Sequence, residues 1–335
     1  MIRRLFFILI VSIGLADSQS HVGIPSAVPE DPDSEIESTV TYIIHGDSDY
    51  AFHQDGSLKQ ADEKVLTEAR IVGEQTVSGE VFVFHLRPRS GINNLVSNNH
   101  RHLDYFRNGK LLISANYKLQ IIRGTFSSEA ELFNSLSAGS NSQNQKKVLL
   151  YFGHEIPPVD GHGYHKSYPK TAFNYHTFVQ GTDGFIEKGT FDLMVLSTCN
   201  NGTPLMVNLL KNRTRYLLAS PQNLHLSHMD SESLTLLENR EKSMRQVAKS
   251  MAESTYRRLT ESIPTAVTLS LYDMREVESY LPALREGYSS YLHGSGYCVG
   301  DDNLDCASLP FFNADQYTEG VQHWYRPARF GQKRD

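Results

Sequence analysis

The chain has 335 residues, of which 39% are hydrophobic and 21% are charged, and its formal net charge is −6. These fractions are ordinary for a globular protein, and the length leaves room for one large domain or two small ones. Because the net charge is negative and no basic block stands out, the composition argues against nucleic acid as a partner.

The first residues carry the pattern of a secretory signal peptide. Arg3 and Arg4 precede an apolar run over residues 5–15, and Gly14 and Ala16 are small residues at the −3 and −1 positions of a cleavage site. The run is too short for a permanent membrane anchor, although an uncleaved short anchor is the alternative. No later segment approaches membrane length. We therefore expect residues 1–16 to be removed and the protein to be secreted or periplasmic, with no permanent membrane span.

Residues 17–38 are rich in Ser, Pro, Asp and Glu and lack periodicity, which predicts a disordered linker or a propeptide. Apolar runs and helical spacings then alternate along the chain, which predicts an α/β fold with a mainly parallel sheet. Strands are expected over 39–44, 80–86, 110–114, 117–122, 147–153, 191–198, 216–220 and 265–271, with 110–122 forming a hairpin. Helices are expected from 61 to a stop at Gly73, over 127–136 with Ser-Ser-Glu as its cap, and over 204–210, 244–259 and 274–292.

One of these strands ends in a cysteine. The apolar run that begins at Phe191 is followed by Cys199 and then by Asn-Asn-Gly, the composition of a tight turn. In α/β sheets, ligands bind at the carboxyl ends of the strands. A thiol at such an end is a candidate nucleophile, whereas in mid-strand it would act as a small hydrophobe.

A thiol near neutral pH needs help, because its free pKa is about 8.5 and only the thiolate attacks. The usual helper is an imidazole that favours the thiolate and later protonates the leaving group. The run from Val148 ends in Gly153 and His154, which repeats the design of the Cys199 strand. If the two strands are adjacent and parallel, His154 and Cys199 face one cleft.

The two remaining cysteines, Cys298 and Cys306, flank a short polar loop. In an oxidising compartment they could form a local disulfide, and the alternative is two free thiols. The disulfide would leave Cys199 as the odd thiol, and an odd cysteine in a secreted protein suggests a reactive role.

The His and Cys strand ends resemble those of the caspase-like cysteine peptidases, and within that group the chain is most similar to the clostripain family. The resemblance covers about residues 39–292 and rests on segments 39–47, 191–199, 216–221 and 266–274. It implies a caspase-like three-layer sandwich over 39–293, with about six strands flanked by helices, and a C-terminal extension over 294–335. It also implies endopeptidase activity on peptide or protein substrates through an acyl-enzyme, with no metal or other cofactor.

The resemblance also implies that backbone N–H groups hold the oxyanion, here those of Glu155 and Cys199. The family usually has Gly after its histidine, where this chain has Glu155, but a backbone donor tolerates that change if the turn does. A His-Gly pair occurs at His162, although no apolar strand precedes it. We therefore prefer His154 over His162 as the catalytic histidine.

Substrate preference departs from the family pattern. Clostripain-like enzymes that cut after Arg or Lys have an Asp two residues before the cysteine, and this chain has Ser197 there. A neutral hydroxyl cannot pair with a guanidinium as a carboxylate does. Asp230 could supply the charge of the substrate pocket from a nearby loop, or it could be a helix N-cap.

Two other classes of function compete with a cysteine peptidase. His162 and His165, and again His225 and His228, have a spacing that zinc sites use, but they lie in loop-like sequence without a fixed carboxylate partner. A caspase-like fold that binds a partner without catalysis is the second alternative. Asn201-Gly202-Thr203 is a glycosylation sequon against the proposed nucleophile, which favours a source that does not glycosylate.

Overall fold

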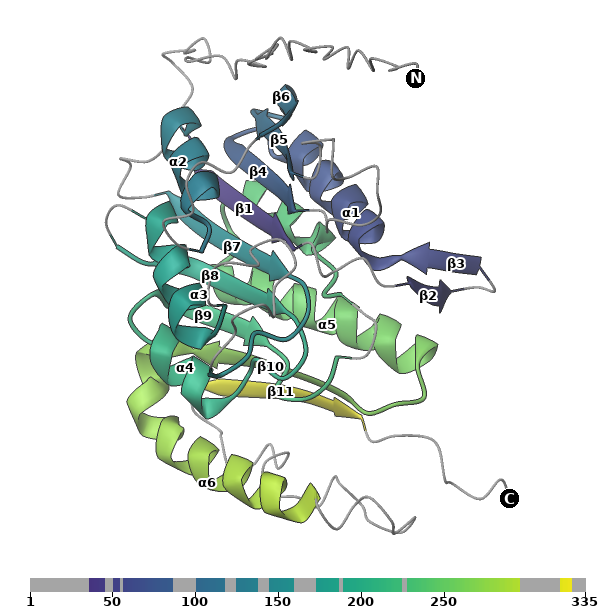
Figure 1. Cartoon of the computed structure of the whole chain (residues 1–335), viewed down its shortest axis with the longest axis vertical. Coiled ribbons are helices and arrows are strands. Elements are labelled where there is room, and N and C mark those ends of the chain that lie inside the picture. Colours follow the sequence, from purple (N-terminus) through teal and green to yellow (C-terminus); the bar gives the residue numbers. More distant parts are fainter. Residues whose placement is uncertain are drawn as a thin grey trace, which may run out of the picture.

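The computed structural model describes residues 36–45, 51–54, 57–86, 101–117, 125–137, 145–159, 173–186, 189–224, 228–295 and 320–326 (Figure 1). Its main sheet consists of β1 (Ser38–Ile44), β4 (Gly79–Leu86), β5 (Arg101–Arg107), β6 (Lys110–Asn116), β7 (Lys146–Phe152), β8 (Phe191–Ser197), β9 (Thr214–Ala219), β10 (Val267–Asp273) and β11 (Val321–Arg326). A separate hairpin contains β2 (Ala51–Gln54) and β3 (Ser57–Gln60).

The main sheet has nine strands in the order β11-β10-β9-β8-β7-β1-β4-β5-β6. The five central strands, β9 to β4, are parallel, and the strands at both edges are antiparallel. The α/β class and the parallel core are therefore confirmed, but the sheet is larger than the expected six strands. One added edge strand, β11, comes from the segment expected as a C-terminal extension.

A hairpin was expected over 110–122, with 117–122 as its second strand, but residues 118–122 lie outside the described ranges. Within those ranges, β6 pairs with β5, which precedes it. The turn is Asn108-Gly109, and both residues have positive φ (52° and 73°). Asn-Gly is the preferred dipeptide of a type I′ hairpin turn, so this dipeptide was the signal to follow.

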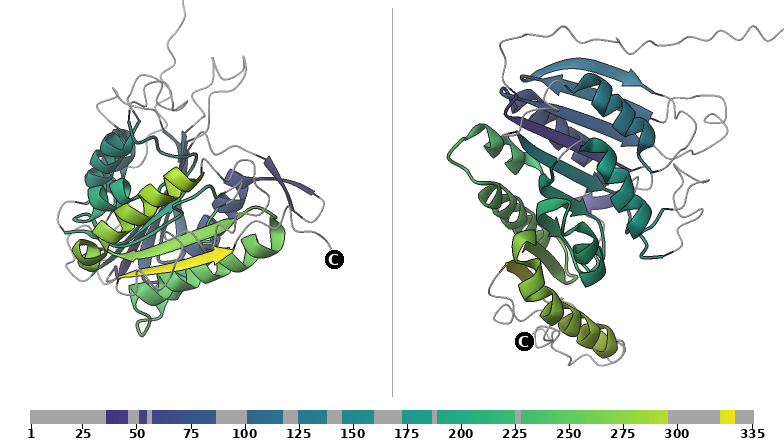
Figure 2. Two further views of the ribbon diagram at one scale, coloured as in Figure 1. Left: turned by 90° about the horizontal axis from the view of Figure 1, so that it is seen from below. Right: turned by 90° about the vertical axis from the view of Figure 1, so that its left-hand side faces the viewer.

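Helices cover both faces of the sheet, as Figure 2 shows. One face packs against α2 (Ser127–Leu136), α3 (Tyr175–Thr182), α4 (Pro204–Leu210) and α6 (Val277–Ser295). The opposite face packs against α1 (Ala61–Gln75), α5 (Met244–Ser262) and the 3₁₀ helix η3 (Glu232–Glu238). Two shorter 3₁₀ turns are η2 (Asp183–Phe185) and η4 (Met274–Glu276). The three-layer sandwich is thus confirmed.

Two helix ends differ from the expected ones. Helix α1 continues past Gly73 to Gln75, and a Cβ at Gly73 would lie 2.6 Å from the Phe106 ring. Gly73 therefore permits close packing of α1 on β5 and is not a stop. Helix α2 begins after Phe126, whose φ is 60°, and has no side-chain cap. Among the described residues, no helix is long and apolar enough to cross a membrane.

Candidate active site

Cys199 follows β8 at its carboxyl end, as expected. Along this strand, Leu193 and Val195 pack toward α1 and α5, whereas Met194 and Leu196 pack toward the other helical layer. Such alternation fixes the face that each residue presents. Beyond the strand the thiol is half-buried.

A sharp turn ends the Cys199 segment. Asn200 adopts a left-handed conformation (φ 53°), which Asn tolerates better than most residues. The backbone of Gly202 approaches the next loop so closely that a Cβ would lie 2.7 Å from the Pro221 nitrogen. Gly202 N also donates to the Ser220 carbonyl over 2.7 Å. The tight turn predicted from Asn-Asn-Gly is therefore present.

His154 follows the neighbouring strand at the same edge of the sheet. Strands β7 and β8 are adjacent and parallel, and Phe152 is paired with Ser197 at the end of the ladder. The register sets residues that are 45 positions apart opposite one another. His154 and Cys199 have this same offset, and each lies two residues beyond the last pair. His154 is exposed. The adjacency on which the cleft hypothesis depended is thus present.

Beyond the ends of β7 and β8, side-chain hydrogen bonds link the two loops that follow these strands. Asn200 Nδ2 donates to Glu155 Oε2 over 2.7 Å. Asn201 accepts from Ile156 N over 2.9 Å and donates to Ile156 O over 3.0 Å. These pairs keep the same 45-residue offset, so the two loops that carry His154 and Cys199 remain aligned beyond the ladder.

The next loop contacts the thiol itself. Cys199 Sγ donates to Asn223 Oδ1 over 2.8 Å, and Leu224 N donates to the sulfur over 3.3 Å. An N–H that points at sulfur favours the thiolate, whereas an accepting carbonyl favours the thiol. The sulfur is therefore held by groups from the segment after β9.

Ser197, expected in the substrate pocket, is buried and accepts a hydrogen bond from Met229 N over 2.7 Å. It shares the α1 and α5 face of the sheet with Val195. Its hydroxyl therefore anchors the loop around Met229 and supplies no charge.

Asp230 lies one residue further along this loop, and its carboxylate is already paired. Arg258 Nε on α5 lies 2.7 Å from Asp230 Oδ1, and His228 Nε2 lies 3.5 Å from the same oxygen. Burial alone would raise the pKa of Asp230, but the His228 hydrogen bond and the Arg258 guanidinium outweigh it and hold the pKa below its ordinary value. The N-cap of η3 is Ser231, so the N-cap interpretation of Asp230 is wrong.

Replacing Arg258 with Met should destabilise the fold by about 2–3 kcal/mol at pH 7, because it leaves Asp230 as a largely buried charge without its guanidinium. The depressed pKa of Asp230 means that its stabilising contribution is present above its unfolded pKa, near 3.9, and is lost as the pH falls through the folded value. Urea unfolding should therefore show a loss that is constant above about pH 5 and shrinks near pH 4.

The matched control is Lys249→Met, on the same helix. Lys249 lies 3.6 Å from Glu253 in an exposed pair, so its removal should cost about 0.5 kcal/mol or less. An Arg258→Met loss as small as that of Lys249→Met would contradict the buried-pair interpretation.

The same network is the one place among the described ranges where three metal-ligating side chains converge. Ligand atoms of Glu68, His228 and Asp230 lie within 4.8 Å of one another. Glu68 accepts from His228 Nε2 over 3.0 Å and from Ser231 N over 2.7 Å. Because Arg258 already neutralises Asp230, we interpret Glu68, His228 and Asp230 as part of an ion-pair network and not as a zinc site. His162, His165 and His225, like Cys298 and Cys306, lie outside the described residues.

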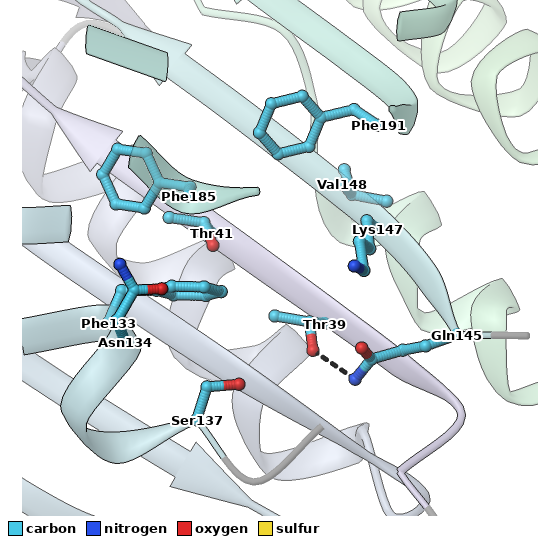
Figure 3. A pocket seen from close by; sticks show the side chains of 10 residues that line it. All are labelled: Thr39, Thr41, Phe133, Asn134, Ser137, Gln145, Lys147, Val148, Phe185 and Phe191. Atoms are coloured by element: carbon cyan, nitrogen blue, oxygen red, sulfur yellow. Dashed lines mark hydrogen bonds between the residues drawn. The ribbon is translucent and has the colours of Figure 1, made fainter. Parts of the chain in front are cut away.

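A small cavity lies at the opposite ends of the central strands, where β1, β7 and β8 begin (Figure 3). Gln145 Nε2 donates to Thr39 Oγ1 over 2.6 Å at its rim. Its volume of about 10 Å³ suits one water molecule and no substrate. The His154 and Cys199 edge is therefore the better candidate for chemistry.

Two residues of the site were missed or misread in the sequence. Asn223 has no sequence signal, because its contact with Cys199 depends on the path of a distant loop. Asn201 stood out only as a sequon, yet its side chain is fully buried and both polar atoms are engaged. A glycan on Asn201 is incompatible with this fold.

No protein-family model and no curated protein sequence matches the chain. Its structure is similar to that of a secreted C11 cysteine protease from Bacteroides thetaiotaomicron in complex with an irreversible peptide inhibitor. The TM-score is 0.55 at 17% identity, over 87% of this chain and 84% of that chain. A second structure, described as the secreted C11 cysteine protease "iotapain" of the same species, gives a TM-score of 0.55 at 15% identity, over 87% and 88% of the two chains. The clostripain-like resemblance is thus confirmed as a likeness of fold.

Proposed function

From a fold shared with secreted C11 cysteine proteases, we propose that this chain is an exported cysteine endopeptidase that hydrolyses peptide bonds through Cys199 and His154. One observation carries the proposal. The two residues lie at the carboxyl edge of adjacent parallel strands, each two positions beyond the paired residues Phe152 and Ser197. This edge is where α/β folds place their ligand sites.

The proposed reaction begins with attack of the Cys199 thiolate on the scissile carbonyl carbon. The backbone N–H groups of Cys199 and Glu155 hold the oxyanion of the tetrahedral intermediate. His154 gives its proton to the leaving amine as the C–N bond breaks, which leaves an acyl-enzyme. His154 then takes a proton from water, whose oxygen attacks the thioester carbonyl carbon. The C–S bond breaks, which releases the acid product and restores the Cys199 thiolate.

Neither of the two described residues proposed for the substrate pocket, Ser197 and Asp230, is a ready partner for a basic side chain. Ser197 is neutral and bonded to Met229 N, and Asp230 is paired with Arg258. A guanidinium in the pocket would have to compete with Arg258 for that carboxylate. We therefore expect no strong preference for cleavage after Arg or Lys.

Export belongs to the same proposal. Residues 1–16 act as a signal peptide, and the segment from residue 17 up to β1 acts as a linker or propeptide ahead of the peptidase domain; β1 begins at Ser38, so the expected linker boundary at residue 38 lies inside the sheet. The two similar structures are described as secreted proteases, which supports a secreted or periplasmic location.

A cleavage profile tests the function directly. The mature protein is incubated with a peptide library that presents each residue type at the cleavage position, and the products are identified by mass spectrometry. We expect cleavage that iodoacetamide abolishes and that EDTA leaves unchanged. Loss of cleavage with EDTA would favour the zinc alternative, and absence of cleavage across the library would favour a partner-binding protein.

A further inference from the structure

The β7–β8 ladder ends before the residues proposed to react. Its last pair is Phe152 and Ser197, whereas His154 and Cys199 lie two residues beyond. Two positions of extended backbone cover about 6–7 Å, which is enough for the two loops to diverge. Groups other than the ladder must therefore hold these loops together.

Beyond the end of the ladder, the Asn201 side chain makes the hydrogen bonds that link the two loops. Its Oδ1 accepts from Ile156 N and its Nδ2 donates to Ile156 O, so one carboxamide satisfies both backbone groups of a single residue. A paired strand makes this pattern of contacts with its neighbour. Ile156 directly follows Glu155, whose N–H is the proposed oxyanion donor. The Asn201 side chain thus holds the backbone one residue away from the proposed oxyanion donor, Glu155.

The carboxamide has only one usable orientation. Turned by 180°, it would face the Ile156 carbonyl with an oxygen and the Ile156 N–H with an amino group. Thr198 Oγ1 also donates to Asn201 Oδ1, and Tyr175 Oη lies 3.4 Å from Nδ2. The side chain is 0% exposed, so water cannot replace any of these partners at low cost.

We propose that Asn201 is a positioning residue that holds the His154–Ile156 segment in register with Cys199 and so fixes the oxyanion donor and the imidazole relative to the thiol. The proposal rests on the proposed peptidase function. It assigns to Asn201 an effect on the reaction rate of correctly folded enzyme in addition to its effect on stability.

The first test replaces Asn201 with Ala. We expect kcat per folded molecule to fall at least about 30-fold, with KM changed less than about 3-fold, because the contribution lost acts in the transition state. The matched control is Gln145→Ala, which removes another buried carboxamide at the opposite edge of the sheet. Gln145→Ala should lower the melting temperature and leave kcat within about 2-fold of wild type.

The second test, Asn201→Asp, covers the case in which the Ala variant does not fold. An ionised carboxylate repels the Ile156 carbonyl, whereas a protonated one donates to it as the amide does. The activity of Asn201→Asp relative to wild type should therefore rise as the pH is lowered, at constant folded fraction by circular dichroism. The Asn201 carboxamide of the wild type does not ionise, so residue 201 makes no contribution to the pH dependence of wild-type activity.

A thiol measurement separates this inference from the peptidase proposal. The rate of Cys199 alkylation by iodoacetamide needs no peptide substrate, and it reports whether the imidazole can assist formation of the thiolate. We expect Asn201→Ala, or Asn201→Asp at neutral pH, to alkylate at least about 5-fold more slowly than wild type at pH 7. If wild type cleaves no peptide, the function fails and the alkylation rates still decide the role of Asn201. Wild-type kcat in folded Asn201→Ala, or unchanged alkylation in both variants, would overturn the role of Asn201.

Discussion

Cys199→Ala should abolish peptide hydrolysis, with kcat reduced about 10⁴-fold or more, because the proposed acyl-enzyme forms on the Cys199 sulfur. The fold should survive. Cys199 is only half-buried, and two groups that contact its sulfur are the exposed Asn223 side chain and the backbone N–H of Leu224. The expected change in unfolding free energy is about 1 kcal/mol or less. Steady-state kinetics and thermal unfolding measured on the same preparation check both parts.

The control for Cys199 removes the other two thiols. A Cys298→Ala, Cys306→Ala double variant should keep its activity and its sensitivity to iodoacetamide, and peptide mapping should locate the adduct on Cys199. Activity that survives in Cys199→Ala would disprove the proposed mechanism. An adduct that forms only on Cys298 or Cys306 would place the reactive thiol elsewhere.

His154→Ala has the second largest expected effect. Loss of the imidazole should lower kcat about 10²–10⁴-fold, since both thiolate formation and protonation of the leaving amine depend on it. The pH profile of alkylation should also change, because the imidazole no longer assists formation of the thiolate. Stopped-flow alkylation between pH 5 and 9 measures this shift without any substrate.

Two histidine variants serve as controls for His154. His176 is exposed on α3, and His176→Ala should keep kcat within about 2-fold. His162→Ala tests the other candidate for the catalytic histidine and should stay within about 3-fold of wild type. A larger loss in His162→Ala than in His154→Ala would reverse the assignment.

The central sheet was predictable because its strands are buried on both faces and read as apolar runs. Strands β7 and β8 each stood out in this way, and each is followed, two residues beyond its end, by a residue type that carries chemistry. The connection between them is long enough for one crossover, which allowed the two strands to be adjacent and parallel, and the sheet pairs them in this way. The sequence therefore predicts which ends of the strands carry the candidate site.

The edge strands were harder to predict, since they mix polar and apolar residues. Strand β5 reads RHLDYFR and β11 reads VQHWYR, and neither forms a continuous apolar run. The sequence signal for the β5–β6 hairpin is the Asn108-Gly109 turn that joins the two strands. Edge pairing depends on the turn and on the partner strand more than on composition.

Contacts between distant side chains could not be predicted from one sequence. Glu68 and His228 are 160 positions apart, and their contact requires α1 to pack beside the loop after β9. Asp230 looked like a free carboxylate for the same reason, because Arg258 reaches it from α5. Such pairs depend on the assembled layers, which local patterns do not encode.

The 45-residue offset between β7 and β8 has a consequence for how the chain can vary. The size of the offset depends on the length of the connection through α3. The alignment of His154 with Cys199, in contrast, depends on the ladder and on Asn201. Insertions in that connection would change the spacing and leave the alignment intact. A slip of one residue in the register would instead shift the two side chains by about 3.3 Å and reverse the faces of the strand. Divergent relatives should therefore be sought by strand pairing, since a fixed His-to-Cys spacing in sequence would miss them.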